Sequence, residues 1–147
     1  MPDLTAQLLP HFETNRLPGL DLGDGFIYPD YNGGSILNLP ASLCQLLGIP
    51  ELNGKPLHAE MLTPLLDGGP VRRIVLVLMD ALSLHRLQRW TQGPGLGETA
   101  PIWQQIARGG LLAPLTSIVP STTSAAITSL WTGRSAAEHG VAGYELW

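Results

Sequence analysis

Residues 74–80 read IVLVLMD, and this segment carries the main prediction of fold class. Residues 74–79 are apolar without interruption. A run of this kind is typical of a strand covered on both faces, as in a parallel, doubly wound sheet. Asp80 follows the run directly, and ligands of open parallel sheets bind at the carboxyl ends of the strands. Asp80 is therefore the first candidate functional residue.

Helix and strand signals alternate from this run to the end of the chain. The predicted elements are, in order, a helix at 82–90, a glycine-rich break at 93–97, a helix at 101–107, a strand at 111–119 and a helix at 123–132. This alternation predicts an α/β fold in which a right-handed crossover joins parallel strands flanked by helices. Because two strands make a small sheet, we expect the sheet to be truncated after its first strands.

Residues 1–70 have a different character, since they are rich in Gly and Pro and carry several turn signals. A helix is predicted after Asn38, with Pro40 near its start and Gly48 as its stop. We therefore expect a loop-rich N-terminal segment with short helices at 1–70, followed by an α/β region at 71–147.

Composition narrows the classes of function. The 147 residues, 44% of them hydrophobic and 14% charged, suffice for one domain with its own core. A net charge of -4 disfavours binding to a nucleic-acid backbone. Cys44 is the single cysteine, so a disulfide or a cysteine-based zinc site is excluded. The sequence has neither a secretory signal nor a membrane-spanning run, so we expect a cytoplasmic protein.

A second candidate site follows the second predicted strand, where residues 120–124 read PSTTS. Hydroxyl groups at a helix N-terminus lie among free backbone N–H groups, which stabilise an alkoxide or a phosphate. The alternative is that these hydroxyls, like Asp80, only cap the helices that follow them. If the two strands are neighbours, both sites lie at one edge of the sheet, which favours a functional site.

Three blocks in order carry a family resemblance: IVLVLMD at 74–80, VPSTT at 119–123 and TGRSAAEHGV at 132–141. Together they resemble the type I phosphodiesterase/nucleotide pyrophosphatase branch of the alkaline phosphatase superfamily, over residues 71–147. The resemblance implies an alkaline phosphatase-like α/β fold. It also implies hydrolysis of phosphodiester or phosphomonoester bonds in a small, nucleotide-like substrate.

The same resemblance implies a site with two divalent metal ions, usually zinc. Asp80 matches the first metal-binding aspartate of the family, and Thr123 matches its threonine nucleophile, which also contacts the metal. Two cations can lower the pKa of the hydroxyl and stabilise the attacking and leaving oxygens. The reaction would then pass through a phosphothreonine that water cleaves.

The sequence departs from the family pattern in two places. Residues 124–126 read SAA where diesterases commonly have Phe-Pro-Asn, and Tyr144 replaces an asparagine that assists phosphate binding. Both diester and monoester substrates therefore stay open. The Cys/Ser-x-Pro-x-Arg element of sulfatases is absent from this region, which disfavours sulfate ester hydrolysis.

The remaining metal ligands are not evident in the sequence. The four histidines, His11, His58, His85 and His139, have no close ligand spacing. We interpret His11 and His58 as surface residues, and His139 as a residue that holds its turn by hydrogen bonds. The other ligands are expected downstream of Trp147, so the chain would be the N-terminal portion of the enzyme. The alternatives are a non-catalytic α/β anion-binding module or an inactive truncated product.

Overall fold

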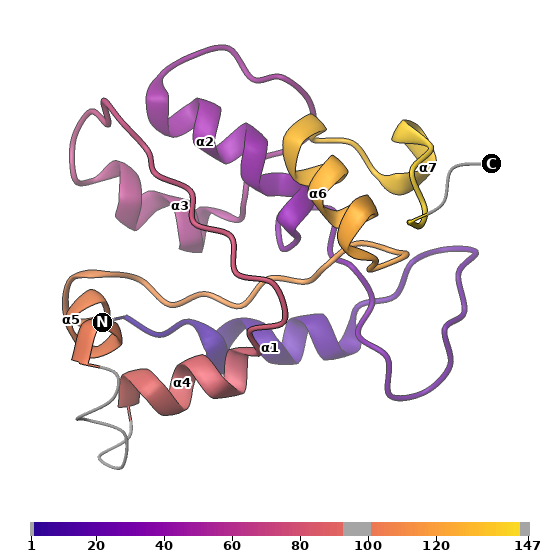
Figure 1. Ribbon diagram of the computed structural model, residues 1–147, viewed down its shortest axis with the longest axis horizontal. Helices are drawn as coiled ribbons and strands as arrows, with labels where there is room; N and C mark the ends of the chain where they lie inside the picture. The colour runs from indigo at the N-terminus through magenta and orange to yellow at the C-terminus, as the bar shows by residue number, and fades with distance from the viewer. Residues whose placement is uncertain (1, 93–100, 145–147) are drawn as a thin grey trace.

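A computed structural model describes residues 2–92 and 101–144, which form helices joined by long irregular connections (Figure 1). The glycine-rich break predicted at 93–97 lies outside the described residues. The helices are α1 (Thr5–Thr14), the 3-10 helix η1 (Ile36–Asn38), α2 (Leu39–Leu47), α3 (Ala59–Leu66), α4 (Leu84–Gln92), α5 (Pro101–Gly109), α6 (Thr123–Thr132) and α7 (Ala136–His139). None of these described helices is both long and apolar enough to cross a bilayer.

The helices predicted from the sequence are present, and glycines end two of them. The helix predicted after Asn38 is α2, with a proline in its first turn and Gly48 as its C-cap. The helix predicted at 123–132 is α6, which Gly133 ends. Both glycines adopt left-handed backbone conformations, with φ values of 66° and 65°. Only glycine adopts this conformation without steric cost, so these two helix ends are encoded locally.

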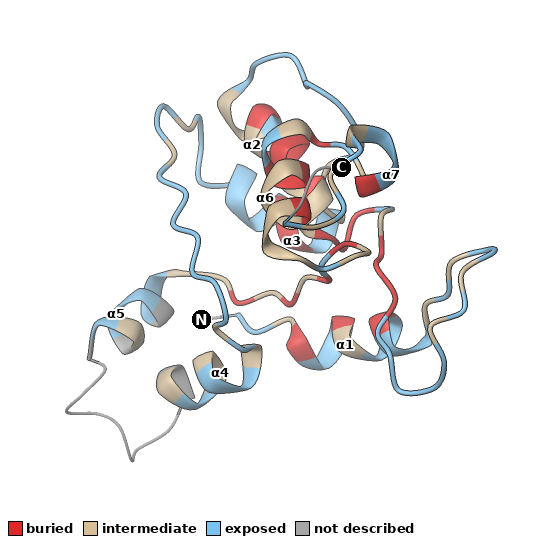
Figure 2. Ribbon diagram, turned by 45° about the vertical axis from the view of Figure 1, so that its right-hand side comes forward, coloured by how far each residue is buried: buried red, intermediate tan, exposed pale blue. Residues whose placement is uncertain are grey.

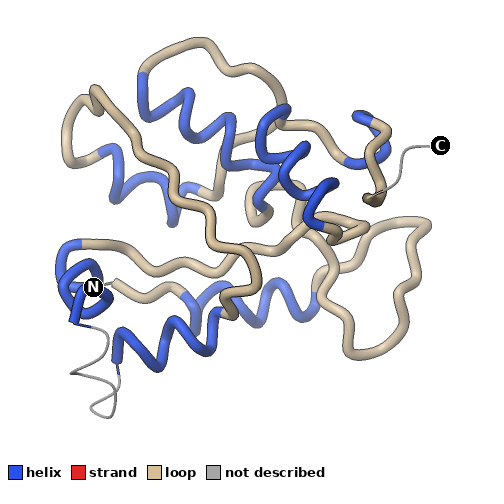
Figure 3. The backbone as a smooth tube through the Cα atoms, viewed as in Figure 1, coloured by secondary structure: helices blue, strands red, loops and turns tan. Residues whose placement is uncertain are grey.

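The predicted parallel sheet is not confirmed, because the described residues contain no strand. Residues 74–79 lie in the connection from α3 to α4, and residues 111–119 in the connection from α5 to α6 (Figure 3). The β pairing among the described residues consists of two isolated parallel bridges, Asp3 with Leu112 and Ser35 with Thr116. Residues 111–119 thus pair with the N-terminal segment and not with residues 74–79.

Among the described residues, 74–79 lack the cover and the backbone partners that a buried strand needs. Val75 is 85% exposed and Val77 is 68% exposed, although the prediction required cover on both faces. A strand also needs neighbouring backbone to pair its N–H and C=O groups. The bridges supply such partners to residues 111–119, whereas residues 74–79 take part in neither of them.

Residues 111–119 join the N-terminal segment in a shared core, and Figure 2 shows buried positions on α1, α2 and α6. One cluster of buried residues comprises Leu8, Phe12 and Met61, and the other comprises Ile118, Ala125 and Ala136. Leu115 packs against the first cluster, and Tyr31 against the second. The N-terminal segment is therefore part of the hydrophobic core that supports α6.

The short helix α7 begins with a capping box formed by Ser135 and Glu138. The Ser135 backbone N–H donates a hydrogen bond of 2.7 Å to Oε2 of Glu138, and the Ser135 hydroxyl donates another of 2.7 Å to the same oxygen. These hydrogen bonds lower the pKa of Glu138 below that of an ordinary glutamate. The larger effect comes from the Ser135 hydroxyl and the next from the Ser135 backbone N–H. The ionised carboxylate is therefore the form that caps α7.

Glu138→Gln is expected to destabilise the protein slightly at pH 6 and by less at pH 3. Because the pKa of Glu138 is lowered on folding, its contribution is full above the ordinary glutamate pKa and disappears as pH falls through the lowered value. The effect should be small, since the carboxylate is exposed and solvent screens it. The midpoints of urea unfolding of the wild type and the variant, measured at pH 6 and pH 3, give the size of the effect. A difference between the two proteins that does not change with pH would contradict the prediction.

Candidate active site

The two site residues predicted from the sequence lie next to each other. Thr123 is the first residue of α6, and Asp80 follows the connection at 74–79. The Thr123 hydroxyl donates a hydrogen bond of 3.3 Å to Oδ2 of Asp80, across 43 residues of sequence. The prediction placed them together at a sheet edge, whereas here the start of α6 and the turn at Asp80 bring them together.

The carboxylate of Asp80 is held by its own turn. Its Oδ1 accepts a hydrogen bond of 2.8 Å from the backbone N–H of Ala81, whose φ of 58° is uncommon for a residue other than glycine. The capping hydrogen bond of α4 comes from another residue, since Oγ of Ser83 accepts the N–H of Arg86 at 3.3 Å. Asp80 therefore does not cap α4, and its Oδ2 faces Thr123.

The hydroxyl residues around Thr123 have separate tasks. Thr122 is the N-cap of α6, and its Oγ1 accepts a hydrogen bond of 3.4 Å from the N–H of Ala125. Thr122 and Ser124 also donate hydrogen bonds of 3.0 and 2.7 Å to the carbonyls of residues 142 and 143. Capping is thus done by Thr122, which leaves the Thr123 hydroxyl to contact Asp80.

Tyr144 completes the surroundings of the Thr123 hydroxyl. The Tyr144 hydroxyl donates a hydrogen bond of 3.1 Å to Oγ1 of Thr123, and the Tyr144 residue is 76% exposed. The resemblance drawn from the sequence puts Tyr144 where the family has an asparagine. A phenol in this place can donate a hydrogen bond to an anion beside Thr123, as an amide could.

His139 has the structural role expected for it. Its Nδ1 accepts a hydrogen bond of 3.1 Å from the N–H of Val141, so the ring proton lies on Nε2, which is 3.0 Å from Oγ of Ser129. Both ring nitrogens are therefore engaged within the protein. The bond to Ser129 ties α7 to α6, which holds the turn after α7 beside Thr123.

Asp80 and Thr123 line a cavity of about 210 Å³. Its walls are mainly apolar and include Leu76, Met79 and Ile127. Drug-sized ligands occupy pockets of about 300–1,000 Å³, so this cavity is smaller than such ligands need.

The oxygens of Asp80 and Thr123 also fit a metal ion. Two oxygen ligands, each about 2.0–2.2 Å from a tetrahedral zinc ion, lie about 3.3–3.6 Å apart. Oδ2 of Asp80 and Oγ1 of Thr123 are 3.3 Å apart. Within residues 2–92 and 101–144, however, no cluster of three His, Cys, Asp or Glu side chains includes Asp80. Asp80 and Thr123 therefore supply two ligands of a metal site and not a complete set.

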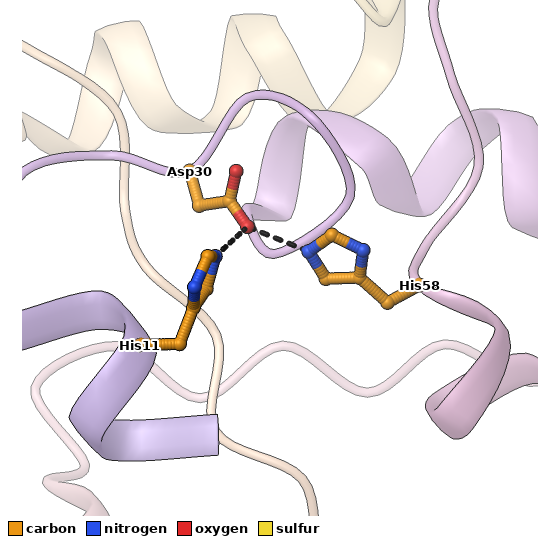
Figure 4. Close-up of side chains that lie close together, drawn as sticks. All are labelled: His11, Asp30 and His58. Carbon is orange, nitrogen blue, oxygen red and sulfur yellow. Dashed lines mark hydrogen bonds and ion pairs between the residues drawn. The ribbon is translucent and has the colours of Figure 1, made fainter. Parts of the chain in front are cut away.

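A second polar cluster, formed by His11, Asp30 and His58, was missed by the sequence reasoning (Figure 4). Nε2 of His58 is 2.6 Å from Oδ2 of Asp30, and Nε2 of His11 is 3.5 Å from the same oxygen. The Asp30 side chain is only 4% exposed, and that of His58 is 29% exposed. The interpretation of His58 as a surface residue is therefore wrong, whereas the His11 side chain is 56% exposed.

Comparison with known proteins supports the three-block resemblance. The family model for type I phosphodiesterase / nucleotide pyrophosphatase matches residues 74–147, which are 74 of the 147 residues and include Asp80 and Thr123. Searches of curated proteins and of solved structures gave no match. The chain belongs to the type I phosphodiesterase/nucleotide pyrophosphatase family, whose fold is alkaline phosphatase-like and whose members hydrolyse phosphate esters.

Proposed function

We propose that this chain serves in the hydrolysis of a phosphodiester or phosphomonoester of a small, nucleotide-like molecule, with Thr123 as the nucleophile and with metal ligands in addition to Asp80 and Thr123. Asp80 and Thr123 would hold one of two divalent metal ions of the zinc type. The observation that carries the proposal is the hydrogen bond from the Thr123 hydroxyl to Asp80 at the start of α6. Both residues lie within the part of the chain that the family model matches.

In the proposed reaction, the Thr123 hydroxyl gives up its proton to water and its Oγ1 forms a bond to phosphorus, while the bond from phosphorus to the leaving oxygen breaks and that oxygen keeps the electron pair. The product of this step is a phosphothreonine, and a water molecule then attacks phosphorus and restores the hydroxyl. Asp80 orients the hydroxyl before the attack, because it accepts the hydrogen bond from Thr123. The metal ions would supply positive charge next to the attacking and leaving oxygens.

Two features of the chain stabilise negative charge on the phosphate. The N-terminus of α6 presents the positive end of a helix dipole to any anion bound beside Thr123. The Tyr144 hydroxyl already donates a hydrogen bond to Oγ1 of Thr123, so it can reach an anion bound there. Neither feature distinguishes a diester from a monoester, so both substrates belong in the test.

The proposal predicts that hydrolysis requires metal and Asp80. The full chain is freed of metal with a chelator, and Zn²⁺ is then added in the presence of bis(p-nitrophenyl) phosphate or p-nitrophenyl phosphate. Zn²⁺ should restore hydrolysis, and Asp80→Asn should lower it at least about 100-fold, because even groups that only support metal ligands typically contribute 10–100-fold.

Asp67→Asn is the matched control, since Asp67 is an exposed aspartate at the end of α3. It should leave hydrolysis unchanged. Hydrolysis that needs neither metal nor Asp80 would remove the metal assignment. Phosphate binding without metal and without hydrolysis would favour the anion-binding module.

A further inference from the structure

The side chains of His11, Asp30 and His58 converge on one point from three separate segments (Figure 4). One possible ligand atom from each residue lies within 4.8 Å of those of the other two. Oδ1 of Asp30 is already used, because it accepts a hydrogen bond of 3.1 Å from the N–H of Asn32. Oδ2 is the oxygen that faces Nε2 of both histidines.

Two adjacent glycines let the backbone approach this cluster closely. A Cβ atom on Gly34 would lie 2.5 Å from Oδ2 of Asp30, and one on Gly33 would lie 2.7 Å from Nδ1 of His58. The backbone N–H of His58 donates a hydrogen bond of 2.9 Å to the carbonyl of Gly33. The turn therefore holds Asp30 and His58 in place, as a preorganised site requires.

The buried carboxylate of Asp30 faces two imidazoles. The carboxylate is buried, and in the described part of the chain its ion-pair partners are His11 and His58, with no lysine or arginine. A buried carboxylate needs a compensating charge. Imidazole nitrogens and carboxylate oxygens are ligands that zinc and similar divalent ions prefer, so a bound cation would supply that charge.

From this geometry we propose that His11, Asp30 and His58 bind one divalent transition-metal ion of the zinc type, at a site separate from Asp80 and Thr123. The 3.5 Å between His11 and Asp30 agrees with the separation of about 3.3–3.5 Å between two ligands of a tetrahedral zinc ion. The 2.6 Å between His58 and Asp30 is a hydrogen bond, which lengthens by less than about 1 Å when the ion replaces its proton. Because the His11 side chain is 56% exposed, water can reach the fourth position.

The test is a titration of the full chain with Co²⁺, whose visible absorption reports coordination, followed by displacement with Zn²⁺. It is carried out in the double variant Asp80→Asn/Thr123→Ala, so that the site proposed for hydrolysis makes no contribution. We expect one Co²⁺ per chain. His11→Gln added to this background should weaken binding at least tenfold, and it should leave the fold intact because the side chain is largely exposed.

His85→Gln in the same background is the matched control, since His85 is an exposed histidine on α4. It should bind Co²⁺ as the background does. Absence of Co²⁺ binding in the background, or an equal affinity with and without His11, would overturn the proposal. Because the background lacks Thr123 and Asp80, neither result depends on whether the chain hydrolyses phosphate esters.

Discussion

Replacing Thr123 with alanine is expected to lower Zn²⁺-supported hydrolysis of phosphate esters by about 10³-fold or more. Loss of a nucleophile removes the covalent route and leaves only the catalysis that binding and electrostatics provide. The fold should be unaffected, because Thr122 and not Thr123 caps α6. Initial rates with the diester and the monoester substrates, at equal Zn²⁺ concentration, measure the effect.

Two further variants make this test specific. Thr123→Ser keeps the hydroxyl and should retain most of the activity that Thr123→Ala loses. Thr128→Ala removes another threonine of α6, whose hydroxyl only donates to the carbonyl of Ser124, and should leave the rate unchanged. Hydrolysis that survives Thr123→Ala would show that another group attacks the phosphorus.

Phe12→Ala is expected to destabilise the protein by about 3–5 kcal/mol, as is typical when a buried phenylalanine is truncated. Phe12 is only 1% exposed and belongs to the cluster with Leu8 and Met61. It therefore joins α1 to α3, and its removal would leave a cavity between them. The free energy of unfolding from urea titrations, analysed as a two-state transition, measures the loss.

The other phenylalanine of the chain provides the control. Phe26 is 60% exposed, so Phe26→Ala should change the free energy of unfolding by less than about 0.5 kcal/mol. Equal effects of the two substitutions would mean that α1 and α3 do not share the core described above.

Several features could be predicted from the sequence because their causes are local. The ends of α2 and α6 depend on single glycines that adopt left-handed conformations, and the start of α7 depends on two residues three positions apart. The family, too, could be predicted, because the three blocks that carry it are short and lie in order along the chain. Asp80 and Thr123 became candidates through the same blocks.

The strand pairing could not be predicted. An apolar run indicates that a segment tends to be buried, but it does not identify the segment that covers it. Leu112 and Thr116 pair with Asp3 and Ser35, and residues 75–79 remain exposed. The sequence indicated that both segments are apolar. Their partners depend on contacts between residues far apart in the chain.

The positions of α2, α4, α5 and α6 and the family could thus be read from the sequence, since each of these helices depends on residues close together in the chain and the family on three short blocks. The contact of Asp30 with His11 and His58 depends on tertiary packing, because these residues lie 19 and 28 positions away from it in the chain. The packing of α1 and α3 and the close approach of the backbone at Gly33 and Gly34 bring them together. No spacing within the sequence encodes such a cluster, since it exists only once the separate segments share a core.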